Sequence, residues 1–472
     1  MPMFEPVSRA FTLSDQAAFA RLSGDENPMH IDPVLSRRML FGAPVVHGVH
    51  LLLWALEHLC AGMSGAHKLD SLKVAFETPV LVEHQAVLKI DAIGADTFRA
   101  VIRVGAKTAV RITAVISEGS WAGAWPAERE PIRDCRDTRP EELADRSGAI
   151  PLELSAEILA RQFPFVAVIL PRGQIAILLA STRLVGMECP GLRSIYSALA
   201  LQFSGSTARS GSLTYRTRNF DERFSLVQMA LSCDGVTGEA AAFVRPAVRD
   251  QAPFGDMAKL VSPGRFAGVK ALIVGGSRGL GEVTANLIAA GGGNVAVTYH
   301  LGREDAQRVV AAIRDGGGQA CALRYDLQAA PPGEIPTAPY TLGFFYASAK
   351  IRASAGMFDQ SLFRDFCRYY LTGALECLDW FANRSGTEGT FVYPSSVYVS
   401  AVPAGFAEYT AAKAAGEVAC QEAIQRYRKM KLLVPRLPRM MTDQTVSLRD
   451  AQAEDPAAVM ASLLMEMIPP PG

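Results

Sequence analysis

Alternation of apolar and polar side chains marks four strands in the first quarter of the chain. Apolar residues recur at every second position within residues 72–76, 87–90, 98–104 and 110–116. A period of two places one face of each strand against a core, and adjacent runs of this kind are typical of an antiparallel sheet. A stretch that is apolar nearly all round, residues 49–59, predicts a buried helix around which this sheet curls.

The segment 151–248 shows a similar order of elements. An apolar stretch at residues 195–203 follows a Pro-Gly turn, and it predicts a second buried helix. Each apolar stretch is followed by a strand that opens with Ser-Leu, at residues 71 and 212. We therefore predict two copies of one α+β unit. Chance similarity between two unrelated α+β units is the alternative.

From about residue 265 onward, strands alternate with helical stretches. The apolar run 270–274 leads into a Gly-rich turn, a helix over 282–290 and a second strand over 294–299. This βαβ order predicts a doubly wound α/β domain with a parallel sheet.

The chain of 472 residues is long enough for about three domains. Residues 119–150 carry many charges together with Pro and Gly and have no periodicity, which is typical of a linker. The sequence therefore predicts a multidomain protein, α+β followed by α/β. The expected boundaries are 1–118 for the first copy, 119–150 for the linker, 151–250 for the second copy and 265–472 for the α/β domain.

The composition refines this picture mainly by exclusion. Hydrophobic residues make up 49% of the chain and charged residues 20%, which is typical of a globular protein. The 47 basic residues balance the 47 acidic ones, so the basic excess of a nucleic-acid-binding protein is missing. The eight cysteines are scattered, no signal peptide is visible, and no apolar run reaches the roughly 18 residues of a membrane span. We expect a cytoplasmic protein with neither a membrane nor a nucleic-acid partner.

Asp25 and His30 are the first candidates for chemistry. They lie on either side of an Asn-Pro turn that follows a short amphipathic helix, for which Ser14 is the expected N-cap. A carboxylate and an imidazole that converge across a turn can hold a water molecule, one group taking its proton while the other orients it or donates. From these residues alone, a turn-forming Asp and a half-buried structural His are the alternatives.

The surrounding sequence strengthens the catalytic interpretation. Residues 23–33 read Ser-Gly-Asp-Glu-Asn-Pro-Met-His-Ile-Asp-Pro, and residues 41–48 read Phe-Gly-Ala-Pro-Val-Val-His-Gly. These runs resemble the hydratase motif of the MaoC-like, R-specific enoyl-thioester hydratases. The resemblance implies a hot-dog fold with Asp25 and His30 as its catalytic pair. The implied reaction is reversible addition of water to a trans-2-enoyl thioester, which gives the (3R)-hydroxyacyl thioester.

The same resemblance places His47 and Gly48 at the N-terminus of the central helix, where their backbone N–H groups would polarise the thioester carbonyl as an oxyanion site. The second copy lacks this motif and contains no histidine, so we expect it to be catalytically silent and to complete a double hot dog. A metal site at His47, His50 and His58 is disfavoured, because His47 and His50 have no carboxylate neighbours on that apolar helix. We expect no metal.

A Gly-rich turn and a Tyr–Lys pair are the candidates in the C-terminal domain. The turn, residues 275–281, follows a strand and opens a helix, so its backbone can approach a pyrophosphate at the helix N-terminus. Tyr409 and Lys413 lie four residues apart on one helical face, where the ammonium would lower the pKa of the phenol and let it act as acid or base near pH 7. Ser396 follows a strand expected over 390–393, and its hydroxyl would polarise a substrate carbonyl.

This set resembles the short-chain dehydrogenase/reductase family. The resemblance implies catalytic roles for Ser396, Tyr409 and Lys413. It also implies a cofactor site made of Gly275, Ser277, Arg278, Gly279, Leu280, Gly281, Asp326, Leu327 and Ala347. The second strand ends in Thr-Tyr-His without an acidic residue, and Arg278 is placed to meet a 2′-phosphate, so NADPH is favoured over NADH.

The domain also departs from the pattern of that family. Residues 346–349 read Tyr-Ala-Ser-Ala where the family has Asn-Asn-Ala-Gly, and Tyr370 stands where the family has the Asn of its proton relay. Pro438-Arg439 replaces a Pro-Gly, the sequence between residues 326 and 346 is short for a crossover helix, and no final strand is evident. We therefore expect a shortened reductase, and a decayed one is the alternative.

The two activities meet in one intermediate. A reductase would convert a 3-oxoacyl thioester to the (3R)-hydroxyacyl thioester with NADPH, and the hot-dog site would then remove water to give the trans-2-enoyl thioester. We expect the acyl group on acyl carrier protein or coenzyme A, and a homo-oligomeric enzyme. The alternatives are a dehydratase with an inactive dehydrogenase-like scaffold, a carrier-docking or regulatory protein with both sites silent, and a reductase for another carbonyl, such as a sugar or polyketide unit.

Overall fold

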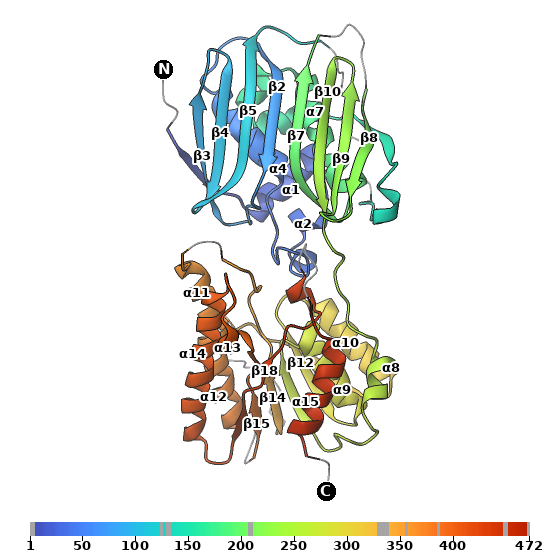
Figure 1. Ribbon diagram of the computed structural model, residues 1–472, viewed down its shortest axis with the longest axis vertical. Coiled ribbons are helices and arrows are strands. Elements are labelled where there is room, and N and C mark those ends of the chain that lie inside the picture. The colour runs from blue at the N-terminus through green and yellow to red at the C-terminus, as the bar shows by residue number, and fades with distance from the viewer. Residues whose placement is uncertain are drawn as a thin grey trace. The chain divides into compact units, whose positions relative to one another are not determined.

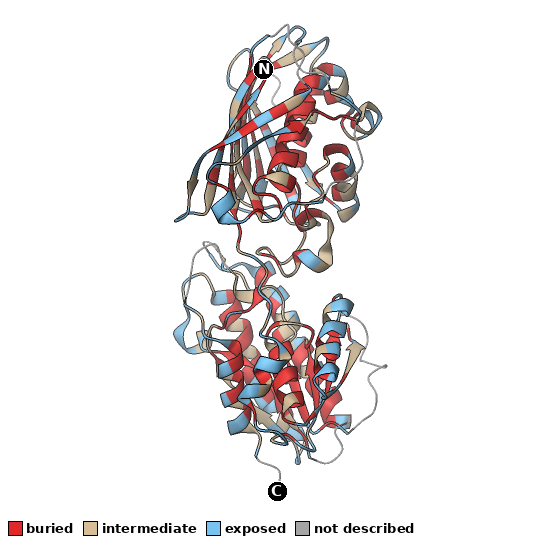
Figure 2. Cartoon of the chain, turned by 90° about the vertical axis from the view of Figure 1, so that its right-hand side faces the viewer, coloured by how far each residue is buried: buried red, intermediate tan, exposed pale blue. Residues whose placement is uncertain are grey.

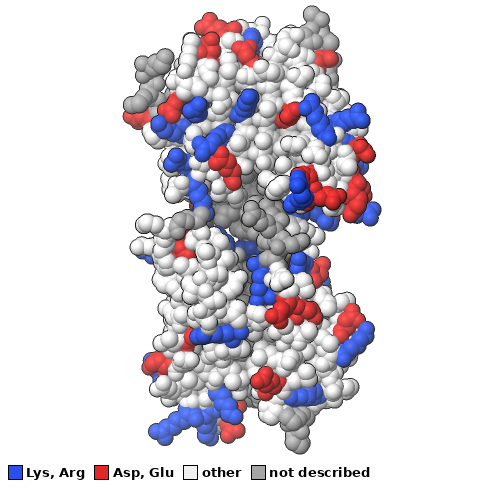
Figure 3. Space-filling model, in the orientation of Figure 1, with Lys and Arg blue, Asp and Glu red and all other residues white. Residues whose placement is uncertain are grey.

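The chain folds into two compact units, the first ending at Ala247 and the second beginning at Val248. The computed structural model describes residues 5–122, 126–128, 134–205, 211–327, 339–354, 357–384, 388–446 and 452–469. None of the helices in these ranges combines the length and hydropathy that a bilayer crossing requires. Acidic and basic side chains are interspersed on the face drawn in Figure 3, in keeping with the zero net charge.

The first unit is built on one ten-stranded antiparallel sheet (Figure 1). Its strands are β1 (Val7–Ala10), β2 (His67–Phe76), β3 (Gln85–Ala92), β4 (Thr97–Val104), β5 (Lys107–Glu118), β6 (Ser147–Pro151), β7 (Ser194–Phe203), β8 (Ser212–Asp221), β9 (Leu226–Cys233) and β10 (Val236–Val244). Their order across the sheet is β1-β3-β4-β5-β2-β7-β10-β9-β8-β6. This order is symmetric about the β2–β7 pair, so β1 to β5 correspond to β6 to β10.

Two buried helices, α4 (Gly48–Cys60) and α7 (Arg172–Arg183), pack against this sheet and share one core with both of its halves (Figure 2). The remaining helices are α1 (Leu13–Ser23), α2 (Pro28–Ile31), α3 (Pro33–Ser36), α5 (Ala156–Gln162), α6 (Pro164–Ile169), the 3₁₀ turn η1 (Pro140–Glu142) and the π-helical turn η2 (Leu184–Glu188). The helix predicted over 49–59 and the antiparallel strands that follow it are confirmed. Helix α1 is capped by Thr12, two residues before the expected Ser14, in a capping box with Asp15.

The second buried helix was predicted at the wrong place. Residues 195–203 form strand β7, which pairs with β2 on one side and β10 on the other, and the helix is α7, upstream of it. A short apolar run does not distinguish a central strand from a buried helix, whereas α7 carries polar side chains, among them Gln174, that the fold buries and hydrogen-bonds. The internal repeat itself is present, but β7 rather than the strand at residue 212 corresponds to β2.

The second unit holds a six-stranded parallel sheet of order β13-β12-β11-β14-β15-β17 (Figure 1). These strands are β11 (Lys270–Val274), β12 (Asn294–Tyr299), β13 (Gln319–Arg324), β14 (Leu342–Phe345), β15 (Thr390–Val392) and β17 (Lys431–Leu433). A short parallel pair, β16 (Ser395–Ser396) and β18 (Arg436–Leu437), lies beyond β15 and β17 in the chain. The strands predicted over 270–274 and 294–299 are confirmed at their bounds.

Helices cover both faces of this sheet, with a separate hydrophobic cluster under each group. One group consists of α8 (Phe254–Met257), η3 (Ala258–Leu260), α9 (Gly279–Ala290), α10 (Arg303–Asp315) and α15 (Pro456–Met467). The other consists of α11 (Gln360–Cys367), the π-helical turn η4 (Arg368–Gly373), α12 (Ala374–Arg384), α13 (Tyr398–Ala401), α14 (Ala407–Ala423) and η5 (Ile424–Arg426). A last turn, η6 (Asp443–Thr445), follows β18. Of the short sequence between residues 326 and 346, positions 328–338 lie outside the described residues.

Candidate active sites

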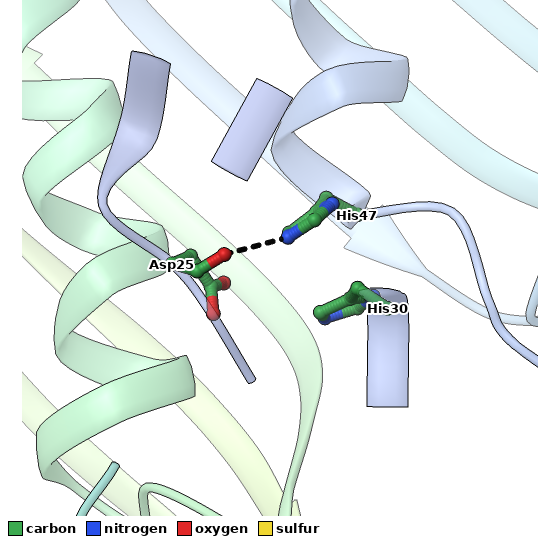
Figure 4. A group of neighbouring side chains, drawn as sticks. All are labelled: Asp25, His30 and His47. Carbon is green, nitrogen blue, oxygen red and sulfur yellow. Dashed lines mark hydrogen bonds between the residues drawn. The ribbon is translucent and has the colours of Figure 1, made fainter. Parts of the chain in front are cut away.

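Asp25, His30 and His47 belong to the first half of the first unit, the half that ends with strand β5. Their side chains converge beside the N-terminus of α4 (Figure 4). Helix α1 ends at Gly24 in the left-handed conformation, and Asn27 caps the short helix α2 that carries His30. One ligating atom from each of the three residues lies within 4.8 Å of the others. The expected convergence of Asp25 and His30 across the Asn-Pro turn is therefore confirmed.

The Asp25 carboxylate is buried and hydrogen-bonded. Its Oδ2 accepts from the Thr182 hydroxyl at 2.7 Å, and its Oδ1 accepts from the Asn27 backbone N–H at 3.3 Å. Burial raises the pKa of Asp25 above its ordinary value, while nearby His30 and the Thr182 hydrogen bond oppose that shift. Thr182 lies on helix α7, so the second repeat of the first unit contributes directly to this site.

The Asp25 carboxylate lies against Gly186, where a side chain would occupy the same space. A Cβ at this position would lie 2.1 Å from Asp25 Oδ1, which no real contact permits. Gly186 lies in the π-helical turn η2, and its carbonyl accepts from the Asn27 side chain at 2.9 Å. Turns of this kind are frequent at functional sites. The second half thus forms one wall of the site.

His30 is held as a neutral imidazole. Its Nδ1 lies 2.8 Å from the Val45 carbonyl, which can only accept, so Nδ1 carries the proton and Nε2 keeps its lone pair. Burial lowers the pKa of His30, although Asp25 opposes the shift. The ring stacks on His47 with centroids 3.8 Å apart. A buried carboxylate beside a neutral imidazole is suited to general acid–base chemistry on water.

The His47 backbone N–H was expected to contribute to the oxyanion site, and this expectation is wrong. This N–H donates to Gln16 Oε1 at 3.1 Å, so it is not available to an oxyanion. The ring nitrogens lie 3.0 Å from Gln16 Oε1 and 3.0 Å from the Asp25 carbonyl, the second contact being the dashed line in Figure 4. Burial holds the pKa of His47 well below its usual range. The Gly48 N–H, the first of α4, has no hydrogen-bond partner among the described residues and remains the candidate oxyanion donor.

The three side chains in Figure 4 are close enough together to hold a cation, but their hydrogen bonds favour proton chemistry. The Nδ1 of His30 and both ring nitrogens of His47 already lie at hydrogen-bond distance from oxygen atoms. His50 is not part of this group, because it stacks on Phe19 with centroids 4.6 Å apart.

In the second unit, the Gly-rich turn between β11 and α9 is closely packed. A Cβ at Gly275 would lie 2.9 Å from the Ala347 backbone nitrogen, and one at Gly281 would lie 2.2 Å from the Gly275 carbonyl. Gly279 begins α9 with a φ of +54°. The turn thus brings bare backbone to the start of a twelve-residue helix, and this arrangement fits a phosphate group of a dinucleotide.

Other residues predicted to bind the cofactor contact other parts of the second unit. The Arg278 guanidinium forms an ion pair with the buried Asp443 carboxylate of η6, so it is not open to a 2′-phosphate in the way expected from the sequence. His300, at the end of β12, pairs with Asp326 at 3.2 Å. Leu327 packs near η4, where its side chain lies 3.5 Å from a Cβ built at Gly373.

Ser396, Tyr409 and Lys413 come together from β16 and α14, and all three are buried. The Lys413 ammonium, however, donates to the Pro394 carbonyl at 2.6 Å and lies 4.1 Å from the ring centre of Tyr370. Burial lowers the pKa of Lys413 to about 7. Burial also raises the pKa of Tyr409 to about 12, and a hydrogen bond with Ser396 opposes that shift. The expectation that Lys413 lowers the Tyr409 pKa is therefore wrong, because the ammonium is weakened by desolvation and directed elsewhere.

Tyr370 changes the surroundings of this site. It lies in η4, its hydroxyl bonds to the Ser348 hydroxyl, and its backbone carbonyl accepts from the Tyr393 hydroxyl at 2.9 Å. The Tyr393 ring is a second aromatic neighbour of Lys413, at 4.9 Å. The ammonium thus lies close to two aromatic rings and one carbonyl.

Comparison with known families agrees with the two domains. Residues 2–114 match the model of the MaoC like domain, and residues 269–452 match that of the short chain dehydrogenase. The chain joins a MaoC-like domain to a short-chain dehydrogenase domain. The first has the hot-dog fold and the second the Rossmann-like parallel sheet.

Each of the curated relatives matches a short part of this chain. "Peroxisomal multifunctional enzyme type 2" of Drosophila melanogaster is 38% identical over 72 residues, 15% of this chain and 12% of the relative. "Peroxisomal hydratase-dehydrogenase-epimerase" of Saccharomyces cerevisiae is 49% identical over 49 residues, 10% and 5% respectively. "(R)-specific enoyl-CoA hydratase" of Aeromonas caviae is 32% identical over 88 residues, 18% and 64%. The chain covers less than two thirds of each of these relatives.

Among solved structures, a short chain dehydrogenase from Burkholderia cenocepacia in complex with NADP is 24% identical, with a TM-score of 0.37 over 42% of this chain and 90% of that one. A 3-oxoacyl (acyl-carrier-protein) reductase from Agrobacterium tumefaciens with NADP bound is 21% identical, with a TM-score of 0.37 over 43% and 88%.

Four residues of the two domains were missed by sequence reasoning: Thr182, Gly186, Gln16 and Asp443. Each acts through a contact between segments far apart in the chain, such as Thr182 with Asp25. No local pattern in the sequence marks these residues as parts of a site, because their partners are distant in the chain.

Proposed function

We propose that this protein is a bifunctional enzyme of acyl-thioester metabolism. Its MaoC-like domain catalyses reversible hydration of a trans-2-enoyl thioester to the (3R)-hydroxyacyl thioester. Its short-chain dehydrogenase domain interconverts that product and the 3-oxoacyl thioester with a nicotinamide cofactor. We favour NADPH because the end of β12 has no acidic residue for the ribose hydroxyl of NADH, although Arg278 is paired with Asp443. The single observation that carries the proposal is the convergence of buried Asp25 with neutral His30.

In the hydration step, Asp25 and His30 hold one water molecule. One of the two groups takes a proton from that water as its oxygen adds to C3, and a proton is delivered to C2, so the addition is balanced. The Gly48 N–H donates to the thioester oxygen, on which negative charge develops in the transition state. Thr182 keeps the Asp25 carboxylate in place for this work.

In the oxidoreduction step, the Gly275–Gly281 turn would hold the cofactor phosphates, and the cofactor supplies or accepts a hydride. Ser396 orients the substrate carbonyl, and Tyr409 exchanges a proton with its oxygen. Burial lowers the pKa of Lys413 to about 7, so its protonation state changes with pH around neutrality.

The proposal is tested by two assays on the purified full chain. Crotonyl-CoA is supplied and loss of its enoyl absorbance is followed; acetoacetyl-CoA is supplied with NADPH and oxidation of the cofactor is followed. We expect Asp25→Asn to reduce hydration by about a thousandfold and leave oxidoreduction intact, and Tyr409→Phe to do the reverse. Loss of both activities in either variant, or of neither, contradicts two independent sites.

A second candidate function is hydration alone, with the dehydrogenase domain as a scaffold. The raised pKa of Tyr409 and the orientation of Lys413 toward Pro394 favour it. Wild-type protein that hydrates crotonyl-CoA, yet oxidises no NADPH or NADH with acetoacetyl-CoA, would establish this reduced function. The acyl carrier, a homo-oligomeric state and a cytoplasmic location remain predictions from the sequence.

A further inference from the structure

An acidic side chain lies at the phosphate-binding turn of the second unit. Asp443 is 2% exposed, and its Oδ1 lies 3.6 Å from a Cβ built at Gly279, the first residue of α9. Its other oxygen, Oδ2, forms the ion pair with Arg278. The carboxylate therefore lies at a helix N-terminus, a position that also favours the phosphate groups of a dinucleotide.

The carboxylate is incompletely satisfied in this position. Asp443 Oδ1 is buried and has no hydrogen-bond partner among the described residues. Lys350 approaches the same residue but donates to its backbone carbonyl, at 2.7 Å, and not to its carboxylate. A buried anionic oxygen without a donor is costly, so the Arg278 ion pair is the contact that holds the Asp443 side chain against the turn.

We propose that Asp443 is a specificity-determining residue that competes with the 2′-phosphate of NADPH for Arg278. This inference rests on the proposed function, because it assumes a nicotinamide cofactor at the Gly275–Gly281 turn. A guanidinium that is paired with a carboxylate has little attraction left for a second anion, and the carboxylate itself repels a phosphate. NADH carries no 2′-phosphate, so its affinity depends much less on this pair.

The competition can be tested by measuring cofactor affinity, without an activity assay. Asp443→Asn keeps the size and shape of the side chain and removes its charge. We expect it to tighten NADPH binding by about tenfold and to change NADH binding by less than about threefold. Glu422→Gln is the matched control, because Glu422 is an exposed acid of α14 paired only with its helical neighbour Arg426 among the described residues.

A double-mutant cycle isolates the competition. Because wild-type Arg278 is paired with Asp443, Arg278→Ala should weaken NADPH binding by less than about threefold in the wild-type background and by about tenfold in the Asp443→Asn background. Dissociation constants for NADPH and NADH are measured by isothermal titration calorimetry on the full chain, and thermal unfolding establishes that each variant is folded.

The outcomes distinguish failure of the Asp443 inference from failure of the proposed oxidoreductase function. If NADPH binds with the same dissociation constant to wild-type protein, Asp443→Asn and Glu422→Gln, or if Arg278→Ala has equal effects in both backgrounds, Asp443 does not compete for Arg278 and the inference is overturned while the cofactor site stands. If neither nicotinamide cofactor binds to any folded variant, the proposed oxidoreductase function fails, and the inference fails with it.

Discussion

Asp25 and Tyr409 are both buried proton-transfer candidates, yet their surroundings differ. The Asp25 carboxylate accepts two hydrogen bonds and faces a neutral imidazole, so the groups around it are arranged for acid–base work. Tyr409 keeps its Ser396 partner, but the ammonium of Lys413 lies against Tyr370 and donates to Pro394. Both sites were predicted from sequence motifs. In the first unit the side chains of the motif are arranged for catalysis, whereas in the second unit the Lys413 side chain is directed toward Pro394 rather than Tyr409. Spacing along a helix brings residues near one another, whereas the direction of a side chain depends on its neighbours.

Gly186→Ala tests the arrangement around Asp25, and we expect it to have the largest effect of the variants considered. The new Cβ would lie 2.1 Å from Asp25 Oδ1, so the carboxylate must move. We expect the rate of crotonyl-CoA hydration to fall by at least about a hundredfold, because a displacement of that size disrupts the reacting geometry. Gly205→Ala is the control, since a Cβ there meets no atom within 4 Å. Equal hydration rates for the two variants would show that the second half does not shape the site.

In the second unit, Tyr370→Leu should lower the free energy of unfolding by about 2 kcal/mol, because the aromatic face beside the Lys413 ammonium is lost. Tyr370→Phe keeps the ring and should cost about 1 kcal/mol or less, the value of the hydroxyl contact with Ser348. Calorimetric unfolding of the second unit measures both. The gap between the two variants should shrink in a Lys413→Met background, and an unchanged gap would exclude the ammonium as its cause.

Thr182→Val tests the hydrogen bond that links the two halves of the MaoC-like domain. The hydroxyl favours the ionised form of Asp25 and thereby lowers its pKa, so its removal raises that pKa further. We expect kcat for hydration to fall by about tenfold and the acid limb of its pH profile to move to higher pH. Thr182→Ser should restore both quantities. A fall in kcat with an unmoved acid limb would assign Thr182 a packing role only.

The smallest effect concerns stability against acid. Burial lowers the pKa of His50 from 6.5 to about 3 in the folded chain, so below pH 6.5 the unfolded chain takes up a proton that the folded chain does not. Its contribution to stability is complete above pH 6.5 and is lost as the pH falls toward 3. Between pH 7 and 5.5, wild-type protein should lose about 1 kcal/mol more unfolding free energy than His50→Phe.

Denaturant unfolding of the first unit at the two pH values measures the loss due to His50, and His67→Phe serves as the control. The ring of His50 stacks on Phe19, so a phenyl ring retains the packing. An identical pH dependence in wild-type protein and His50→Phe would contradict burial of a neutral His50.

Much of the fold was predictable because its signals are local. Period-two alternation predicted β2 to β5, and a strand followed by a Gly-rich turn predicted β11, α9 and β12. The second buried helix was misplaced, because the apolar run at 195–203 suits a central strand as well as a helix and α7 conceals polar groups that only tertiary contacts satisfy.

The sequence by itself determined the two families, the residues that carry their motifs, and the convergence of Asp25 with His30, because a turn of five residues limits where those two side chains lie. Only the tertiary structure decided what surrounds them. The Thr182 hydrogen bond to Asp25 joins residues 157 positions apart, and the Arg278 ion pair with Asp443 joins residues 165 positions apart. Such contacts leave no periodic trace in the chain, since they depend on how distant segments pack, and they set the charges and the orientations with which both sites work.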